Sequence, residues 1–168
     1  MPIQSVFNRY QQAGFVGTIS RPDAPHMYDD PGKAAVTLQP GWGVLFDRTN
    51  GNWKLPTSAA EQLQVTHIVG TGIGVIQTAM SGENSDVGVS FAAGTMVRLL
   101  KFGCVYVKCG EAVKKGDLAQ FDYATSTWKR YNPSSGTVAD FRTKTFVFMS
   151  DGVANGIVEV SAEAQSKF

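Results

Sequence analysis

The chain has 168 residues, of which 43% are hydrophobic and 17% are charged, and its formal net charge is +1. This length and apolar content suffice for one domain with its own hydrophobic core, and they exclude an intrinsically disordered chain. A nearly neutral, charge-poor surface disfavours nucleic acid as a partner, because phosphate binding requires clustered lysine and arginine. Such a surface is suited to being covered by other protein.

The N-terminal residues contain no basic segment followed by an apolar one, so no secretory signal is predicted. No apolar run reaches the roughly 18 residues that a membrane span requires. We therefore expect a soluble protein that is made in a cytoplasm. Cys104 and Cys109 lie on one predicted strand with side chains on opposite faces, so both are expected to remain free thiols.

Residues 1–33 differ from the rest of the chain. They contain apolar residues with neither a helical nor a strand period, namely Ile3, Phe7, Tyr10, Phe15 and Val16. The stretch that follows carries Pro22, Pro25 and Pro31, and no regular structure is expected there. The sequence therefore predicts an extended N-terminal arm whose five apolar residues lie on another surface, either the chain's own body or a neighbour.

From residue 34 to residue 168, short apolar runs alternate with turn signals, which is typical of an all-β fold. We predict one β-rich body, a β-sandwich or a distorted β-barrel. One short helix is expected at 58–63, because Ser58 and Glu61 have capping-box spacing. The predicted strands are 34–38, 43–47, 52–55, 65–70, 73–78, 87–92, 95–102, 104–109, 117–122, 127–131, 144–149 and 156–160.

Two segments of the body, residues 40–54 and 115–129, align without a gap at a constant separation of 75 residues. Each predicts a hairpin in which a Phe-Asp pair ends one strand and a tryptophan opens the next. The aromatic rings should pack across the hairpin, and the aspartate should bond the loop backbone. Either a duplication or the independent use of a favourable turn explains the match. The hairpin residues are Phe46, Asp47, Trp53, Phe121, Asp122 and Trp128.

No motif in the chain predicts a catalytic, cofactor or metal site. The glycines at 70–74 lack the following helix of a dinucleotide-binding loop. His26 lies near three aspartates, but the spacing matches no metal-binding loop. Residues 110–122 resemble the turn of a biotinyl or lipoyl carrier, yet the carrier lysine triplet is missing. Enzyme and carrier functions are therefore disfavoured, and no cofactor is expected.

Several segments resemble the structural cement proteins that decorate the heads of tailed bacteriophages. The resemblance is carried by MPIQSVFNRYQQAGFVGTIS (1–20), PGWGVLFDRTNGNWKLPTSAAEQLQVTHIVG (40–70), FAAGTMVRLLKFGCVYVKCGEAVKKGDLAQFD (91–122) and ANGIVEVSA (154–162). Thr95 replaces an acidic residue and Tyr106 stands where tryptophan is common. The order of these motifs along nearly the whole chain, rather than any one of them, supports the resemblance.

The resemblance implies a non-catalytic protein on the outer surface of a phage head that stabilises contacts between major capsid protein subunits. It implies the capsid protein and sister copies as partners, with a trimer favoured and a dimer possible, and no nucleic acid or membrane. The five apolar arm residues would then contact capsid or a sister subunit. The alternative is another virion or cell-surface β-module, of tail or adhesin type, that binds carbohydrate.

Overall fold

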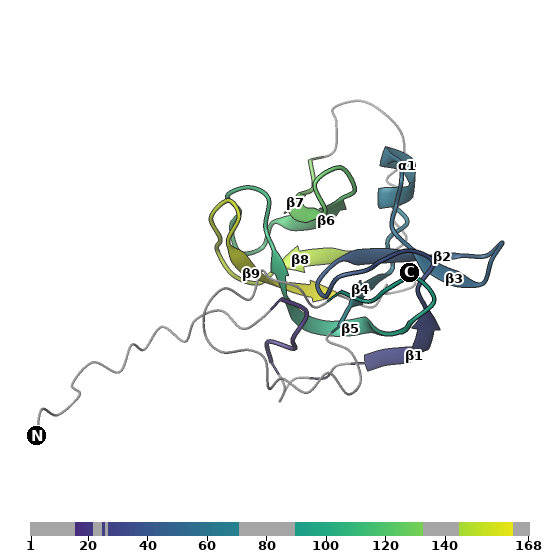
Figure 1. Cartoon of the computed structure of the whole chain (residues 1–168). Helices are drawn as coiled ribbons and strands as arrows, with labels where there is room; N and C mark the ends of the chain where they lie inside the picture. Colours follow the sequence, from purple (N-terminus) through teal and green to yellow (C-terminus); the bar gives the residue numbers. More distant parts are fainter. Residues whose placement is uncertain (1–15, 22–24, 26, 71–89, 133–144, 163–168) are drawn as a thin grey trace, which may run out of the picture.

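The computed structural model describes residues 16–21, 25, 27–70, 90–132 and 145–162. The prediction of an all-β fold is confirmed: this part of the chain forms nine strands and one four-residue helix (Figure 1). The elements are β1 (Met27–Lys33), β2 (Gly43–Asp47), β3 (Asn52–Lys54), α1 (Ala59–Gln62), β4 (His67–Val69), β5 (Met96–Lys108), β6 (Leu118–Asp122), β7 (Thr127–Arg130), β8 (Phe146–Phe148) and β9 (Ile157–Ala162).

The strands form one antiparallel sheet in the order β3-β2-β4-β5-β9-β8-β6-β7, and β1 pairs with β5 beside this path. The sheet curls, as the arrangement of strands in Figure 1 shows, so that β2 faces β6 although the two are not neighbours in the sheet. A methyl group at Gly43 would lie 2.8 Å from Cβ of Phe121. The indole Nε1 of Trp128 donates a hydrogen bond of 2.7 Å to the Gly41 carbonyl. The body is therefore a partly closed, distorted barrel.

The long strand β5 joins two hydrophobic cores. Along β5, buried and exposed residues alternate up to Leu99. Leu100 is also buried, so the face of the strand that points into the protein changes between Leu99 and Leu100. Leu99 belongs to one core, with Ala34, Leu38, Val44, Val69, Phe91 and Val97. Leu100 belongs to the other core, which is built mainly from β5 to β9. The two predicted strands 95–102 and 104–109 are thus one continuous strand.

The prediction that residues 20–32 lack regular structure is wrong for residues 27–32, which belong to β1. This strand pairs with β5 from Met27 opposite Phe102 to Lys33 opposite Met96. The register shifts between Asp29 and Gly32, which places Pro31 inside an irregularity of the ladder. Proline is tolerated in strands at edges and bulges, because it has no N–H to donate. The boundary of the predicted arm therefore moves toward the N-terminus.

The predicted strand 34–38 is not regular either. Ala34 and Leu38 make only isolated bridges, to Trp53 and Phe91 respectively. Both side chains are nevertheless fully buried. The apolar residues of 34–38 therefore reflect burial in the core and not pairing with a neighbouring strand. The predicted strand 73–78 lies outside the described residues, as do residues 87–89 of the predicted strand 87–92.

The body is built from two similar repeats, which are separated by 75 residues at the hairpins but by other distances along the chain elsewhere. From one end the sheet runs β3-β2-β4-β5, and from the other end it runs β7-β6-β8-β9. The strands β2, β3 and β4 of the first repeat therefore correspond to β6, β7 and β8 of the second. Residues 96–100 of β5 correspond to β9, and residues 102–108 of β5 correspond to β1. Lys33 pairs with Met96 in the first repeat, and Lys108 pairs with Ile157 in the second. The strand β5 therefore ends one repeat and begins the next.

Backbone hydrogen bonds outside the strands repeat in the same way. Leu38 and Phe91 exchange two hydrogen bonds, of 2.9 and 2.7 Å, and their counterparts Val113 and Gly152 exchange two of 3.0 Å. The turn before the last strand of each repeat contains a residue with positive φ, Gly94 in the first and Asn155 in the second. Correspondence at this level, far outside the two hairpins, favours duplication over independent use of one turn.

Candidate interaction site

Residues 16–21 form an added edge segment on the second half of β5. Ile19 bridges Val105 in antiparallel fashion. The N–H of Gly17 donates to the Tyr106 carbonyl at 2.7 Å, and the N–H of Tyr106 donates to the Thr18 carbonyl at 3.0 Å. These backbone bonds place residues 16–21 on the edge of β5 away from β9.

The carboxylate of Glu159 locks this segment in place. Glu159 lies on β9 opposite Tyr106. It accepts hydrogen bonds from the Ser20 hydroxyl at 2.6 Å and from Nε and Nη2 of Arg21 at 2.5 and 3.0 Å. Burial alone would raise the pKa of Glu159, but the hydrogen bonds from Arg21 and Ser20 outweigh burial and hold the pKa below its ordinary value. The carboxylate is therefore charged and paired at neutral pH.

Of the five predicted arm contacts, only Val16 lies in the described part of the chain. Its side chain packs over Gly41, where a methyl group would approach Val16 Cγ1 to 2.3 Å. Gly41 also has a φ of +81°, so glycine satisfies both the turn and the close contact. Val16 thus contacts the chain's own body. Ile3, Phe7, Tyr10 and Phe15 lie outside the described residues.

The two predicted hairpins have closely matching geometry. Phe46 lies opposite Trp53, and Phe121 lies opposite Trp128. The ring centroids are 5.3 Å apart in the first pair and 5.6 Å apart in the second, and both pairs are edge-to-face. A third ring completes each cluster: His67 lies 4.5 Å from Trp53, and Phe146 lies 5.0 Å from Trp128. These third members could not be predicted from the sequence alignment of the hairpins, because His67 and Phe146 differ in type.

The hairpin aspartates bond the loops that follow them. Asp47 Oδ1 accepts from the N–H of Thr49 at 2.9 Å, and Asp122 Oδ1 accepts from the N–H of Ala124 at 3.3 Å. The backbone hydrogen bond from Thr49 is the main cause of a lowered pKa of Asp47. Burial opposes ionisation of Asp122, but Lys129 and Thr125 lower its pKa overall. Both aspartates therefore serve turn geometry.

The two aromatic clusters differ in exposure. Phe121 and Trp128 are each 1% exposed, whereas Phe46 is 46% exposed. Gly43 of β2 packs on Phe121, and Val65 belongs to the same core. Gln62, Leu63 and Val65 line a space of only about 10 Å³ beside Phe121 and Phe146. In the first repeat, Phe46 stays open to solvent. The fold thus presents one buried aromatic cluster and one partly exposed copy of it.

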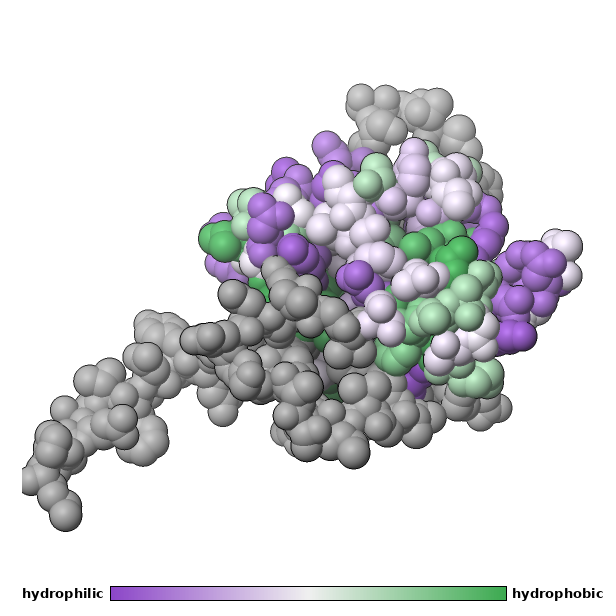
Figure 2. Space-filling model, in the orientation of Figure 1, coloured by the Kyte–Doolittle hydropathy of each residue, from purple (hydrophilic) through white to green (hydrophobic). Residues whose placement is uncertain are grey.

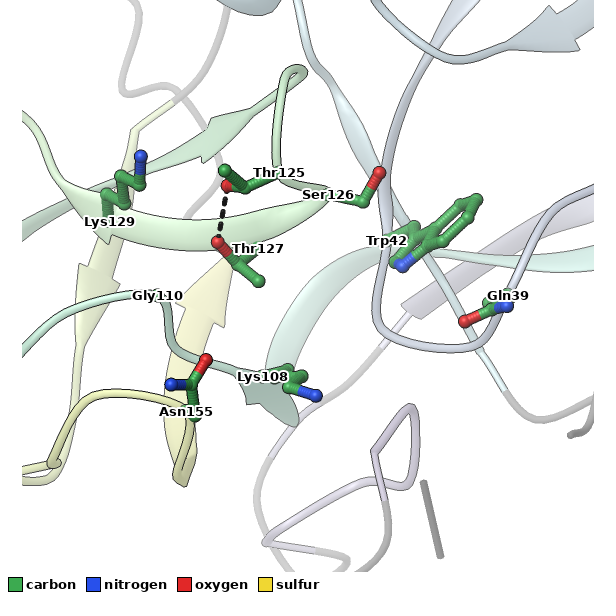
Figure 3. A pocket seen from close by; sticks show the side chains of 9 residues that line it. All are labelled: Gln39, Trp42, Lys108, Gly110, Thr125, Ser126, Thr127, Lys129 and Asn155. Carbon is green, nitrogen blue, oxygen red and sulfur yellow. Dashed lines mark hydrogen bonds between the residues drawn. The ribbon is translucent and has the colours of Figure 1, made fainter. Parts of the chain in front are cut away.

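A polar pocket of about 380 Å³ lies between the repeats (Figure 3). Trp42 and Gln39 enter it from the first repeat, and the other lining residues come from the second: Lys108, Gly110, Thr125, Ser126, Thr127, Lys129 and Asn155. Lys129 is paired with Asp122, and the hydroxyls of Thr125 and Thr127 bond each other. None of the nine lining residues is a carboxylate, histidine or cysteine. The pocket can accept hydrogen-bonding groups, and no histidine or carboxylate among its lining residues is placed to activate the hydroxyls.

Within the described ranges, no group of three or more histidine, cysteine or carboxylate side chains is placed to hold a metal ion. Cys104 and Cys109 are free thiols; burial is the main cause of a raised pKa of Cys109. In the same part of the chain, no helix has the length and apolar character needed to cross a membrane. The candidate interaction features in the described part of the chain are therefore the edge segment at residues 16–21, the exposed aromatic cluster at Phe46 and the polar pocket.

An antiparallel sheet with an N-terminal segment bound at its edge makes the chain an all-β module. The comparison with family models agrees: the model described as structural cement protein (E217 gp24/Pam3 gp6) matches residues 3–163. The chain belongs to this family of phage structural cement proteins. The match spans both repeats and the N-terminal segment, in agreement with the resemblance seen in the sequence. No curated protein matches the chain.

Proposed function

We propose that the protein binds the outer surface of a phage head and stabilises contacts between major capsid protein subunits. Membership of the cement family supports a structural role in association with the capsid and a place in the virion. The observation that carries the finer proposal is the anchoring of residues 16–21 on β5, because it fixes the origin of the N-terminal residues on the rigid body.

Residues 1–15 precede the anchor in the sequence and contain four large apolar side chains: Ile3, Phe7, Tyr10 and Phe15. Each would gain roughly 1.5–3 kcal/mol on leaving water. Fifteen residues can extend over roughly 50 Å. We propose that this segment lies along a capsid or sister subunit. The bonds from Glu159 to Ser20 and Arg21 would hold the residues that follow it on the body. Many copies on one shell would turn a modest contact into strong retention.

The carbohydrate-binding alternative has one observation in its favour, the polar pocket with Trp42 at its wall. Amide, hydroxyl and aromatic side chains are suitable for a sugar. However, Trp42 also packs against both hydrophobic cores, which leaves only part of its ring for a ligand. The cement function is therefore preferred, and binding of a glycan that is abolished by Trp42→Ala in a folded protein would favour the alternative.

Deletion of residues 2–15 tests the proposed arm. We expect the truncated protein to be lost from purified heads in a co-sedimentation assay, because the apolar contacts are gone. Its thermal unfolding should change by only a few degrees, because Val16 and the anchor at 16–21 remain. A variant in which the four apolar residues are replaced by serine provides a control of unchanged length. Full retention of either variant on heads would show that the arm is not a docking element.

A further inference from the structure

One end of the polar pocket between the repeats presents hydrogen-bond donors from two distant segments. Gln39 and Trp42 lie in the turn before β2, and Lys108 is the last residue of β5. In Figure 3 the Lys108 ammonium and the Trp42 indole nitrogen point toward the same space, with the Gln39 amide beside them. We name this end of the pocket the Lys108 subsite. Figure 2 shows the mixed polar and apolar face of the body in the orientation of Figure 1.

The indole N–H of Trp42 is a rigidly held donor at the pocket wall. Trp42 packs against both hydrophobic cores, which fixes its ring. Nε1 of Trp128 donates to the Gly41 carbonyl at 2.7 Å, whereas Nε1 of Trp42 donates to no atom of the described residues. An indole N–H has no acceptor function, and it usually finds a partner where its ring is buried. The group that fits this position is therefore an oxygen acceptor.

Lys108 determines which oxygen acceptor is favoured. The nine lining residues include no carboxylate, and the other lysine among them, Lys129, pairs with Asp122. Lys108 has an interaction within its own chain, but an ammonium carries three donor hydrogens and can bind a ligand as well. Hydrogen bonds from an ammonium are shorter and stronger when the acceptor is also charged. The subsite therefore favours a carboxylate over a neutral carbonyl or hydroxyl oxygen.

The opposite side of the pocket uses its hydroxyl hydrogens within the chain. Thr125 donates to Oδ2 of Asp122 at 2.6 Å. The hydrogen bond of 2.8 Å between Thr125 and Thr127 is then donated by Thr127, because the hydroxyl hydrogen of Thr125 is already used. Neither threonine has a hydroxyl hydrogen left for an anion. The donors that can reach an anionic ligand are thus concentrated at the Lys108 subsite.

We propose that the Lys108 subsite binds a carboxylate group, supplied by an aspartate or glutamate side chain of the major capsid protein. The identity of the supplier rests on the proposed function, whereas the chemistry of the subsite does not. Val16 of the edge segment packs on Gly41, the residue before Trp42 in the sequence. A capsid subunit bound by residues 1–15 would therefore lie close to the subsite, and the two contacts would strengthen each other.

The subsite is tested in the full chain by titration with sodium acetate, followed by the NMR resonance of the Trp42 indole N–H. We expect a saturable shift, because this N–H donates to the bound carboxylate. Sodium chloride at equal ionic strength and acetamide, the neutral isostere, should give no saturable shift. Lys108→Gln should weaken acetate binding roughly tenfold. Lys33→Gln is the matched control, because Lys33 has the corresponding position in the first repeat and does not line the pocket.

The supplier of the carboxylate is tested by binding of the same variants to heads that lack the protein. Lys108→Gln should bind more weakly than the wild type, while Lys33→Gln and Lys108→Arg should retain most of the affinity. An indole resonance that acetate leaves unmoved, or that acetamide or methyl glucoside shifts as acetate does, would overturn the carboxylate subsite. Acetate binding combined with full binding of Lys108→Gln to heads would overturn the capsid protein as the supplier. Failure of the wild type to bind heads would contradict the proposed function instead.

Discussion

The Trp128→Ala variant is expected to be less stable than the wild type by about 3–5 kcal/mol, the cost of removing a large buried aromatic side chain. Trp128 is 1% exposed and lies between the rings of Phe121 and Phe146. Its Nε1 also donates to the Gly41 carbonyl across the curled sheet, so the substitution leaves a buried acceptor without this donor. Urea unfolding monitored by circular dichroism measures the change.

Trp53→Ala provides the matched comparison at the corresponding position of the first repeat. Trp53 packs against Phe46 and His67, but its cluster is open to solvent at Phe46. We expect a loss of about 1.5–2.5 kcal/mol, because less apolar surface returns to water and less of a cavity is left. If Trp53→Ala and Trp128→Ala lose the same free energy of unfolding, the greater exposure of the first cluster does not lower its contribution to stability.

The Glu159→Ala variant is expected to release the N-terminal anchor without unfolding the body. Glu159 accepts three hydrogen bonds from Ser20 and Arg21. Because the Arg21 side chain is 43% exposed, solvent screens the ion pair, and we expect the opening free energy of residues 16–21 to fall by about 1–2 kcal/mol. The amides of Gly17 and Ser20 should then exchange with deuterium roughly tenfold faster.

The same anchor should weaken in acid. The pKa of Glu159 is lowered in the folded protein, so its contribution is present above the ordinary value near 4.5 and is lost as the pH falls through the folded pKa. Protection of Gly17 and Ser20 should therefore decrease below about pH 4.5 in the wild type but not in Glu159→Ala. Asp151→Asn, which alters an exposed pair with Lys114, is the control and should leave this protection unchanged. If Gly17 and Ser20 keep their protection in Glu159→Ala, Glu159 does not hold residues 16–21 on the body.

The sequence predicted the hairpins well because their determinants are local. A glycine with positive φ opens each segment, and an aspartate closes each turn. The helix was also predicted from a local pattern, and Ser58 does accept a hydrogen bond from the N–H of Glu61. Where turn and capping chemistry determines the backbone, neighbouring residues carry the information.

The duplication as a whole could not be predicted, because its other parts depend on pairing between distant residues. The turn FAAGT at 91–95 corresponds to GVANG at 152–156, with one identical residue, yet both form the same bonds to the loop after β1 or β5. β1 was missed because Pro31 and the adjacent irregularity hide its strand pattern. Phe121 is buried because Gly43 and Val65, which are distant in the sequence, pack on it, and no local pattern predicts that contact.

Adding purified protein to heads that lack it shows whether this protein is a cement for a phage head. The measurement is the temperature at which the heads release their DNA, followed by a dye that fluoresces on DNA. We predict that saturating wild-type protein raises this temperature, and that the protein without residues 2–15 does not. Heads that bind the wild-type protein and release DNA at an unchanged temperature, or that do not bind it, would contradict the claim.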